Sequence, residues 1–146
     1  MTTIVRTINR GMLATTTILA ATVGLAATAG AATAAPHPTA AQVTLSETGG
    51  FAGVHNRYVV DATTTHVDTP ELVRLASTQR FQRLDATYPA STPGADRFAY
   101  TVTVRYNDGT TKAVATVEGA DAPTVLWRTI DLTRQISLDV TGTPAC

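Results

Sequence analysis

The sequence predicts an α+β domain of two layers, in which a four-stranded antiparallel sheet carries two helices on one face. Two observations lead to this prediction. Residues 42–47 and 97–106 alternate apolar and polar residues with the period of two that is typical of half-buried strands, and after each of them a glycine-containing turn leads into a second extended run. A segment with the spacing of an amphipathic helix follows each pair, which gives the order β-β-α-β-β-α.

The first 34 residues have the pattern of a secretory signal peptide. Arg6 and Arg10 give the first ten residues a positive charge. Residues 12–25 are apolar apart from several threonines and a glycine, and residues 32–34 (Ala-Thr-Ala) match an A-x-A cleavage site. A retained anchor helix is the alternative, but the run is only weakly apolar for a membrane span. We therefore expect cleavage and a secreted, extracellular mature chain without membrane attachment.

The mature chain is expected to be one small domain without internal disulfides. Cleavage after Ala34 leaves 112 of the 146 residues, which is enough for one domain with its own core. Without Arg6 and Arg10 there are 9 basic and 11 acidic residues, and a net charge of −2 favours neither nucleic acid nor an anionic membrane. Cys146 is the only cysteine, which excludes disulfide-stapled inhibitor scaffolds. A monomer is expected, with a Cys146-linked dimer as the alternative.

The first elements of the mature chain are expected to be a leader and a hairpin. Residues 35–41 are rich in Pro and Ala and are typical of a short flexible leader. Residues 42–47 alternate as a half-buried strand, and residues 51–61 form a second extended run. Between them, Thr48-Gly49-Gly50 supplies residues that tolerate positive φ, so we place the tip of a β-hairpin at the two glycines.

The first helix is expected to begin at residues 68–71, whose sequence is Asp-Thr-Pro-Glu. This order offers a capping side chain, a proline in the first turn and an acid near the positive end of the helix. Leu72, Leu75 and Ala76 then share one apolar stripe. Residues 85–96 contain two prolines and a glycine, and we expect them to form a long surface loop.

The second half of the domain is expected to repeat the hairpin and the helix. In residues 97–106 every second side chain is aromatic or Val, which is the clearest strand pattern in the chain. Residues 107–109 (Asn-Asp-Gly) predict a hairpin turn, and residues 110–118 form the returning strand. A second helix is expected to start at residues 121–123, and residues 137–146 are expected to be a frayed, polar tail.

The residue patterns of catalytic, metal and phosphate sites do not occur in this sequence. The three histidines, His37, His55 and His66, belong to no H-E-x-x-H motif or Cys/His cluster. No G-x-S-x-G elbow occurs, and no Gly-rich loop leads from a strand into a helix. His55 with Asp61 or Asp68 is the remaining acid–base candidate, but Asp61 would lie about 20 Å away along a strand. We predict a binding module with no enzyme activity, no catalytic residue, no metal site and no cofactor.

Two motifs resemble the emfourin family. Residues 43–54 (VTLSETGGFAGV) are similar to the family's opening strand and its G-G-F-A-G turn, and residues 93–104 (PGADRFAYTVTV) are similar to its P-G-A-D-x-F-x-Y segment. Asp108-Gly109 and the Ala122-Pro123 helix start are weaker matches. The resemblance spans residues 42–136, which we take as an emfourin-like inhibitor domain. It implies a protein inhibitor of thermolysin-like zinc metalloproteases such as protealysin.

The resemblance also implies that the domain blocks the active-site cleft of such a protease and does no chemistry itself. In that role Gly49 and Gly50 form a stiff projecting tip, because ordering a mobile loop on binding lowers affinity. Phe51 beside them is expected to be an aromatic anchor in an apolar pocket of the protease. The alternative is that the glycines only form a turn and that Phe51 is part of the core.

A second protease contact is expected from the loop at residues 85–96. Within it, Tyr88, Pro93 and Gly94 are the candidate contact residues. Glu47 near the tip is the acidic side chain expected to approach the protease's zinc ion, without being a ligand. The alternative function is a non-catalytic secreted binding module for another envelope or extracellular protein, which would have the same fold and the same lack of catalytic groups.

Overall fold

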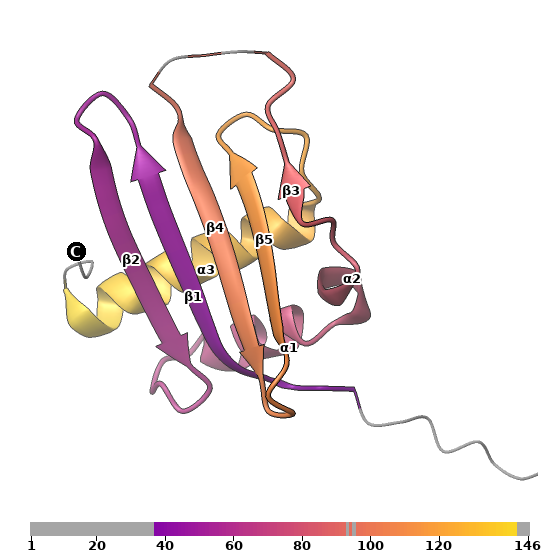
Figure 1. Cartoon of the computed structure of the whole chain (residues 1–146). Helices are drawn as coiled ribbons and strands as arrows, with labels where there is room; N and C mark the ends of the chain where they lie inside the picture. The colour runs from indigo at the N-terminus through magenta and orange to yellow at the C-terminus, as the bar shows by residue number, and fades with distance from the viewer. Residues whose placement is uncertain (1–36, 93, 95, 143–146) are drawn as a thin grey trace, which may run out of the picture. The chain divides into compact units, whose positions relative to one another are not determined.

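The computed structural model describes residues 37–92, 94 and 96–142, which form a five-stranded sheet and three helices (Figure 1). The residues behind the signal-peptide and disulfide predictions, 1–34 and Cys146, lie outside the described residues. The strand order in the sheet is β2-β1-β4-β5-β3. The elements are β1 (Ala40–Gly49), β2 (Val54–Asp61), α1 (Thr69–Ala76), α2 (Gln79–Gln82), β3 (Thr87–Tyr88), β4 (Phe98–Tyr106), β5 (Thr111–Val117) and α3 (Thr124–Thr141).

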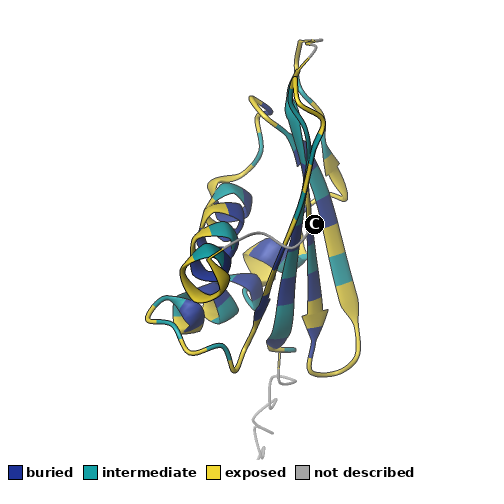
Figure 2. Cartoon of the chain, turned by 90° about the vertical axis from the view of Figure 1, so that its left-hand side faces the viewer, coloured by how far each residue is buried: buried dark blue, intermediate teal, exposed yellow. Residues whose placement is uncertain are grey.

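The helices lie against one face of the sheet, and the other face is open (Figure 2). The predicted alternation decides which side chains face the helices, because successive residues of a strand point to opposite faces. The inward side chains are the most deeply buried ones in the sheet, and they include Val43, Leu45, Val102, Val104 and Val114. The two-layer α+β architecture and both predicted hairpins, β1–β2 and β4–β5, are confirmed. Among the described helices, none is long and apolar enough to cross a membrane.

The prediction of a four-stranded, purely antiparallel sheet is wrong in detail. Residues 85–96, expected to be a loop, contain β3, which pairs parallel with β5 through Thr87 to Ala115 and Tyr88 to Thr116. The Thr116 hydroxyl donates to the Tyr88 carbonyl at 3.2 Å and reinforces this pairing. A two-residue strand is too short to show an alternation. Only its tertiary contact with β5 makes it a strand.

The flexible leader expected at residues 35–41 is partly built into the domain. β1 begins at Ala40, whose side chain is buried and whose N–H donates to Ser77 Oγ at 2.8 Å. The Thr39 N–H donates to Asn107 Oδ1 at 3.0 Å, and the Asn107 N–H donates to the Thr39 carbonyl at 2.9 Å. The leader prediction is therefore wrong from residue 39 onward, because the partners that order this segment lie far along the chain.

The first helical region is broken into two short helices. α1 covers Thr69–Ala76, in agreement with the predicted start, and ends at Ser77. α2 then begins with its own cap, since the Thr78 side chain accepts the Phe81 N–H at 3.2 Å. Phe81 is completely buried, so this second start carries a large apolar side chain into the core.

The last helix, α3, is longer than predicted. It continues through residues 137–141, which were expected to belong to a frayed tail, and it ends at Gly142 in the left-handed conformation. Ile136 and Ser137 are buried, and Leu138 packs against the core. The polar and β-branched residues at this end are weak helix formers. Packing against the sheet decides that they are helical.

Tyr106 joins β4 to α1 through a buried hydroxyl that donates to the Ala76 carbonyl at 3.1 Å. Burial, helped by the charge of Asp108, raises the pKa of Tyr106 from 10.0 to about 12. The neutral form therefore stabilises the fold below pH 10, and this contribution is lost as the pH rises through about 12. Tyr106→Phe should lower the free energy of unfolding by about 1 kcal/mol at pH 7.

The same variant should also be less sensitive to alkali than the unmodified protein. Urea unfolding at pH 7, 10 and 12 measures both effects. The pKa of Tyr58 is also raised, by burial and then by its hydrogen bond to Glu47, so part of the alkaline loss should persist. Equal losses of stability in the two proteins between pH 10 and 12 would rule out Tyr106 as a source of the pH dependence.

Candidate functional site

The β1–β2 turn lies at one end of the sheet (Figure 1), and it carries the exposed side chain of Phe51. The Gly53 N–H donates to the Gly50 carbonyl at 3.0 Å, which closes a turn around Phe51 and Ala52. Phe51 is 95% exposed, so the alternative that placed it in the core is wrong. We call residues 49–53 the tip. A single exposed apolar side chain is common on protein surfaces, so Phe51 is a candidate contact because of the glycine turn that presents it and not because of its exposure alone.

Two glycines allow the tip to lie directly on the backbone that leads into β4. Gly49 has a φ of 109°, and a Cβ there would lie 2.3 Å from the carbonyl oxygen of Arg97. A Cβ on Gly50 would lie 2.9 Å from the ring of Phe98, and the Gly50 N–H donates to the Arg97 carbonyl at 3.4 Å. Any larger residue at Gly49 would push the tip away from β4.

Arg97 connects the tip to two further loops at the same end of the domain. Besides accepting the bond from Gly50, it donates from one guanidinium nitrogen to the Glu118 carbonyl at 3.1 Å and from the other to Thr92 Oγ1 at 3.2 Å. Thr92 belongs to the connection from β3 to β4, and Glu118 follows β5. The three loops therefore form one surface, because one residue holds them together, the tip through its carbonyl and the other two loops through its guanidinium.

The second predicted contact is only partly placed at this surface. Gly94 is exposed near the Arg97 side chain, in a loop that borders a shallow cavity of about 620 Å³. Tyr88 lies lower, in β3, where its partly buried ring packs on the core and its hydroxyl accepts the Asp85 N–H at 3.0 Å. Pro93 lies outside the described residues. The lining of the cavity is Pro89, Ala90, Ser91, Thr92, Gly94, Asp96, Arg97 and Val117.

Glu47 does not point toward the space in front of the tip. Its side chain faces the helices and is 9% exposed. Its carboxylate accepts a bond from Arg134 Nη2 at 2.8 Å and one from the Tyr58 hydroxyl at 3.1 Å. The expectation that Glu47 approaches a zinc ion of the protease is therefore wrong. Arg134, which holds the Glu47 carboxylate on the helix side of the sheet, is 87 positions away in the sequence. No local sequence pattern therefore predicted this pair.

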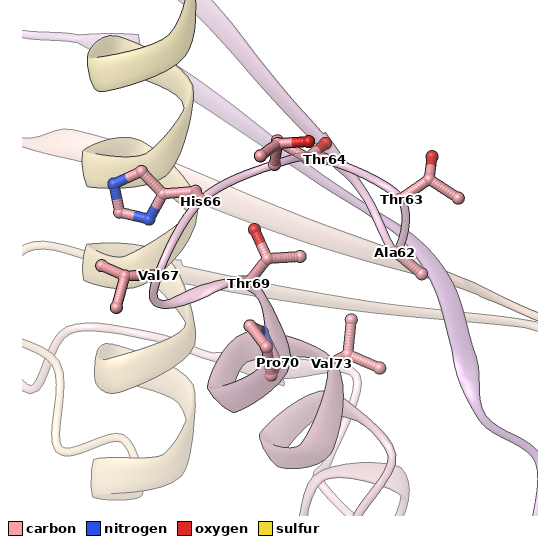
Figure 3. Close-up of a pocket in the computed structure, with 9 residues that line it drawn as sticks. Ala62, Thr63, Thr64, His66, Val67, Thr69, Pro70 and Val73 are labelled. Atoms are coloured by element: carbon pink, nitrogen blue, oxygen red, sulfur yellow. The ribbon is translucent and has the colours of Figure 1, made fainter.

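The opposite end of the domain has a pocket of about 540 Å³ between the β2–α1 loop and the start of α1 (Figure 3). His66 lies at its border, where Nε2 is 3.1 Å from Asp139 Oδ2 on α3 and Nδ1 accepts the Asp68 N–H. His55, the acid–base candidate of the sequence analysis, is exposed on β2. Within residues 37–92, 94 and 96–142, no three His, Cys, Asp or Glu side chains form a group able to hold a metal ion.

The comparison with protein families decides the relationship of this chain. The Emfourin family model matches residues 45–134, which is more than half of the chain. The chain belongs to the Emfourin family. The match confirms the resemblance drawn from the two sequence motifs, and it includes the tip, Arg97, Glu47 and Arg134. Neither the comparison with curated proteins nor that with solved structures gives a match.

Emfourin is a family of protein inhibitors of proteases, so the general function of this Emfourin member is protease inhibition and its partner is a protease. The sequence predicted the tip and Phe51 through the G-G-F-A-G motif. It predicted no contact of the Arg97 side chain, and it did not predict the pair of Glu47 and Arg134. Arg97 was expected to be the first residue of the strand at residues 97–106, directly after the predicted loop at residues 85–96, and this position is the one sequence signal that places it beside a loop.

Proposed function

We propose that this Emfourin member is an exported inhibitor of thermolysin-like zinc metalloproteases and that its tip occupies the active-site cleft. The observation that carries the proposal is the 95% exposure of Phe51 at the end of a firmly held hairpin. Aromatic side chains that fill well-packed, desolvated pockets are frequent energetic anchors in protein interfaces. Thermolysin-like enzymes favour a large apolar side chain just after the cleaved bond, and Phe51 fits that preference.

A preorganised tip suits this function. Each side chain that is immobilised on binding costs about 0.5–1.5 kcal/mol, so a loop already in its bound shape binds more tightly. The bond from Gly53 to Gly50 and the contact of Gly50 with Arg97 hold the tip in one shape before binding. In the proposed complex Phe51 fills the pocket, and the loop around Gly94 contacts the rim of the cleft as a second point. Tyr88 supports that loop from the sheet.

Export is the second part of the proposal, and the first 34 residues support it. A positive start, a mildly apolar run and an A-x-A site are the order of a secretory signal peptide. An extracellular inhibitor and a secreted protease meet in the same compartment, and thermolysin-like proteases are commonly secreted. We expect the mature chain to begin at Ala35. Mass spectrometry of the exported protein measures this directly.

Titration against proteases tests the inhibitory function. The mature chain, residues 35–146, is added in increasing amounts to a thermolysin-like protease with a fluorogenic peptide substrate, and a trypsin-type serine protease serves as the control. We expect the metalloprotease activity to disappear at a near-stoichiometric ratio and the serine protease activity to remain. Unchanged activity of several thermolysin-like enzymes would contradict the proposal and favour a secreted binding module for another extracellular protein.

A further inference from the structure

Beneath the tip, a partly buried ion pair joins β1 to α3, with 9% of the Glu47 side chain and 32% of the Arg134 side chain exposed. Glu47 lies two residues before Gly49, and both of its carboxylate oxygens are occupied on the helix side of the sheet. Oε1 accepts a bond from Arg134 Nη2 at 2.8 Å. Oε2 accepts the Tyr58 hydroxyl at 3.1 Å and the Asn56 side-chain amide at 3.3 Å. One carboxylate therefore holds both strands of the hairpin and the last helix.

The guanidinium of Arg134 also contacts the first of two neighbouring aromatic rings, Tyr100 and Phe98, which lead from Arg134 to the tip. It lies 5.5 Å from the centre of the Tyr100 ring, at a distance typical of a cation–π contact. Tyr100 is 6.4 Å from the Phe98 ring, centre to centre, and the Phe98 ring lies against Gly50. Burial lowers the pKa of Arg134, but the charge of Glu47 and the contact with Tyr100 outweigh burial, so the pKa is raised and the guanidinium stays charged.

We propose that Glu47 and Arg134 are positioning residues that hold the tip in its inhibitory orientation by fixing the hairpin to α3. The effect on inhibition rests on the proposed function, whereas the effect on the tip itself does not. A buried ion pair usually adds little net stability compared with apolar residues of the same size, because removing two charges from water is costly. Its directional bonds instead select one arrangement of the elements that it joins.

A second arginine on α3 provides a matched comparison. Arg128 also pairs with a glutamate, with Nη2 3.1 Å from Glu71 Oε1, and it joins α3 to α1. That pair is exposed, with 52% and 40% of the two side chains accessible, and it lies on the α1 side of α3. This second pair therefore joins α3 to α1, and neither of its residues belongs to the hairpin. Arg128→Met removes it, and Arg134→Met removes the pair beneath the tip.

Two measurements on the full mature chain separate positioning from general stability. The first is cleavage after Phe51 by a chymotrypsin-type protease, whose apolar pocket accepts aromatic side chains and which samples the open population of a loop. The second is hydrogen exchange of the amides at residues 50–54. We expect Arg134→Met to raise both rates about tenfold under conditions where urea unfolding shows the protein folded, since local opening is measured separately from global unfolding. Arg128→Met should leave both rates unchanged.

A milder variant keeps the test decisive if Arg134→Met does not fold. Glu47→Gln retains the shape and one acceptor oxygen but removes the charge and replaces the second acceptor oxygen with an N–H donor, and we expect a smaller increase in the same two rates. Folded variants with the cleavage and exchange rates of the unmodified protein would overturn the proposal. So would a loosened tip that inhibits a thermolysin-like protease as tightly as the unmodified tip. If Arg134→Met loosens the tip and the unmodified protein itself inhibits no thermolysin-like protease, the positioning role is supported and the proposed function is refuted.

Discussion

Phe51→Ala is expected to weaken inhibition of a thermolysin-like protease about a hundredfold while leaving the fold unchanged. Truncation of a central aromatic anchor typically costs 2 kcal/mol or more of binding free energy, and a hundredfold loss corresponds to about 2.7 kcal/mol. Since Phe51 is 95% exposed, its ring packs against little in the free protein. The free energy of unfolding should therefore stay within about 0.5 kcal/mol of the original value. Inhibition constants and urea unfolding curves measure the two quantities.

Val67 offers the control for this variant. It is 86% exposed and lies beside the pocket at the opposite end of the domain. Val67→Ala removes a comparably exposed apolar side chain and should change neither inhibition nor stability. Equal inhibition by Phe51→Ala and the unmodified protein would remove the tip from the interface and move attention to the loop around Gly94.

Gly49→Ala is expected to lower the free energy of unfolding by about 3 kcal/mol and to weaken inhibition as well. The new methyl group would lie 2.3 Å from the Arg97 carbonyl, and the φ of 109° is unfavourable for alanine. Relief of the clash requires β1 to separate from the start of β4, which moves the tip. Urea unfolding and the inhibition constant measure the two consequences.

Gly53→Ala separates the clash from the backbone conformation. Gly53 also has a positive φ, 63°, but no atom lies within 4 Å of the site of a new Cβ. Only the conformational penalty applies there, so the loss of stability should be about 1 kcal/mol. Similar losses for the two variants would contradict the close approach of Gly49 to Arg97.

Local patterns predicted most of the fold because they are themselves physical requirements of the elements. Alternation in residues 97–106 predicted both the strand β4 and its buried face, since a half-buried strand must alternate. Asn107-Asp108-Gly109 predicted the turn that follows, and Gly109 has the expected positive φ of 84°. The tip was predicted in the same way, because a run with three glycines between two strands is typical of a tight turn, and the aromatic residue in such a turn lies where it can contact a partner.

The errors have a common physical cause, which is that the deciding contacts are remote in sequence. β3 exists through its pairing with β5, and the last residues of α3 are helical through packing on the sheet. Glu47 has the position of an acid near an exposed turn, and the alternation of β1 places it on the same face as Val43 and Leu45. The reason why a charge is tolerated on that face is Arg134, which no local pattern connects to it.

By itself the sequence determined the two hairpins, the inward face of the strands at residues 42–47 and 97–106, the start of α1 and the glycine-rich tip with Phe51. These depend on residue type and on spacing within a few positions. Only the tertiary structure decided the strand order, the short parallel strand, the hydrogen bond between the tip and the Arg97 carbonyl, and the pair of Glu47 and Arg134. Hydrogen bonds and ion pairs between distant segments form only when the sheet and the helices pack together. Local sequence patterns relate residues a few positions apart, so they do not show which distant residues will meet.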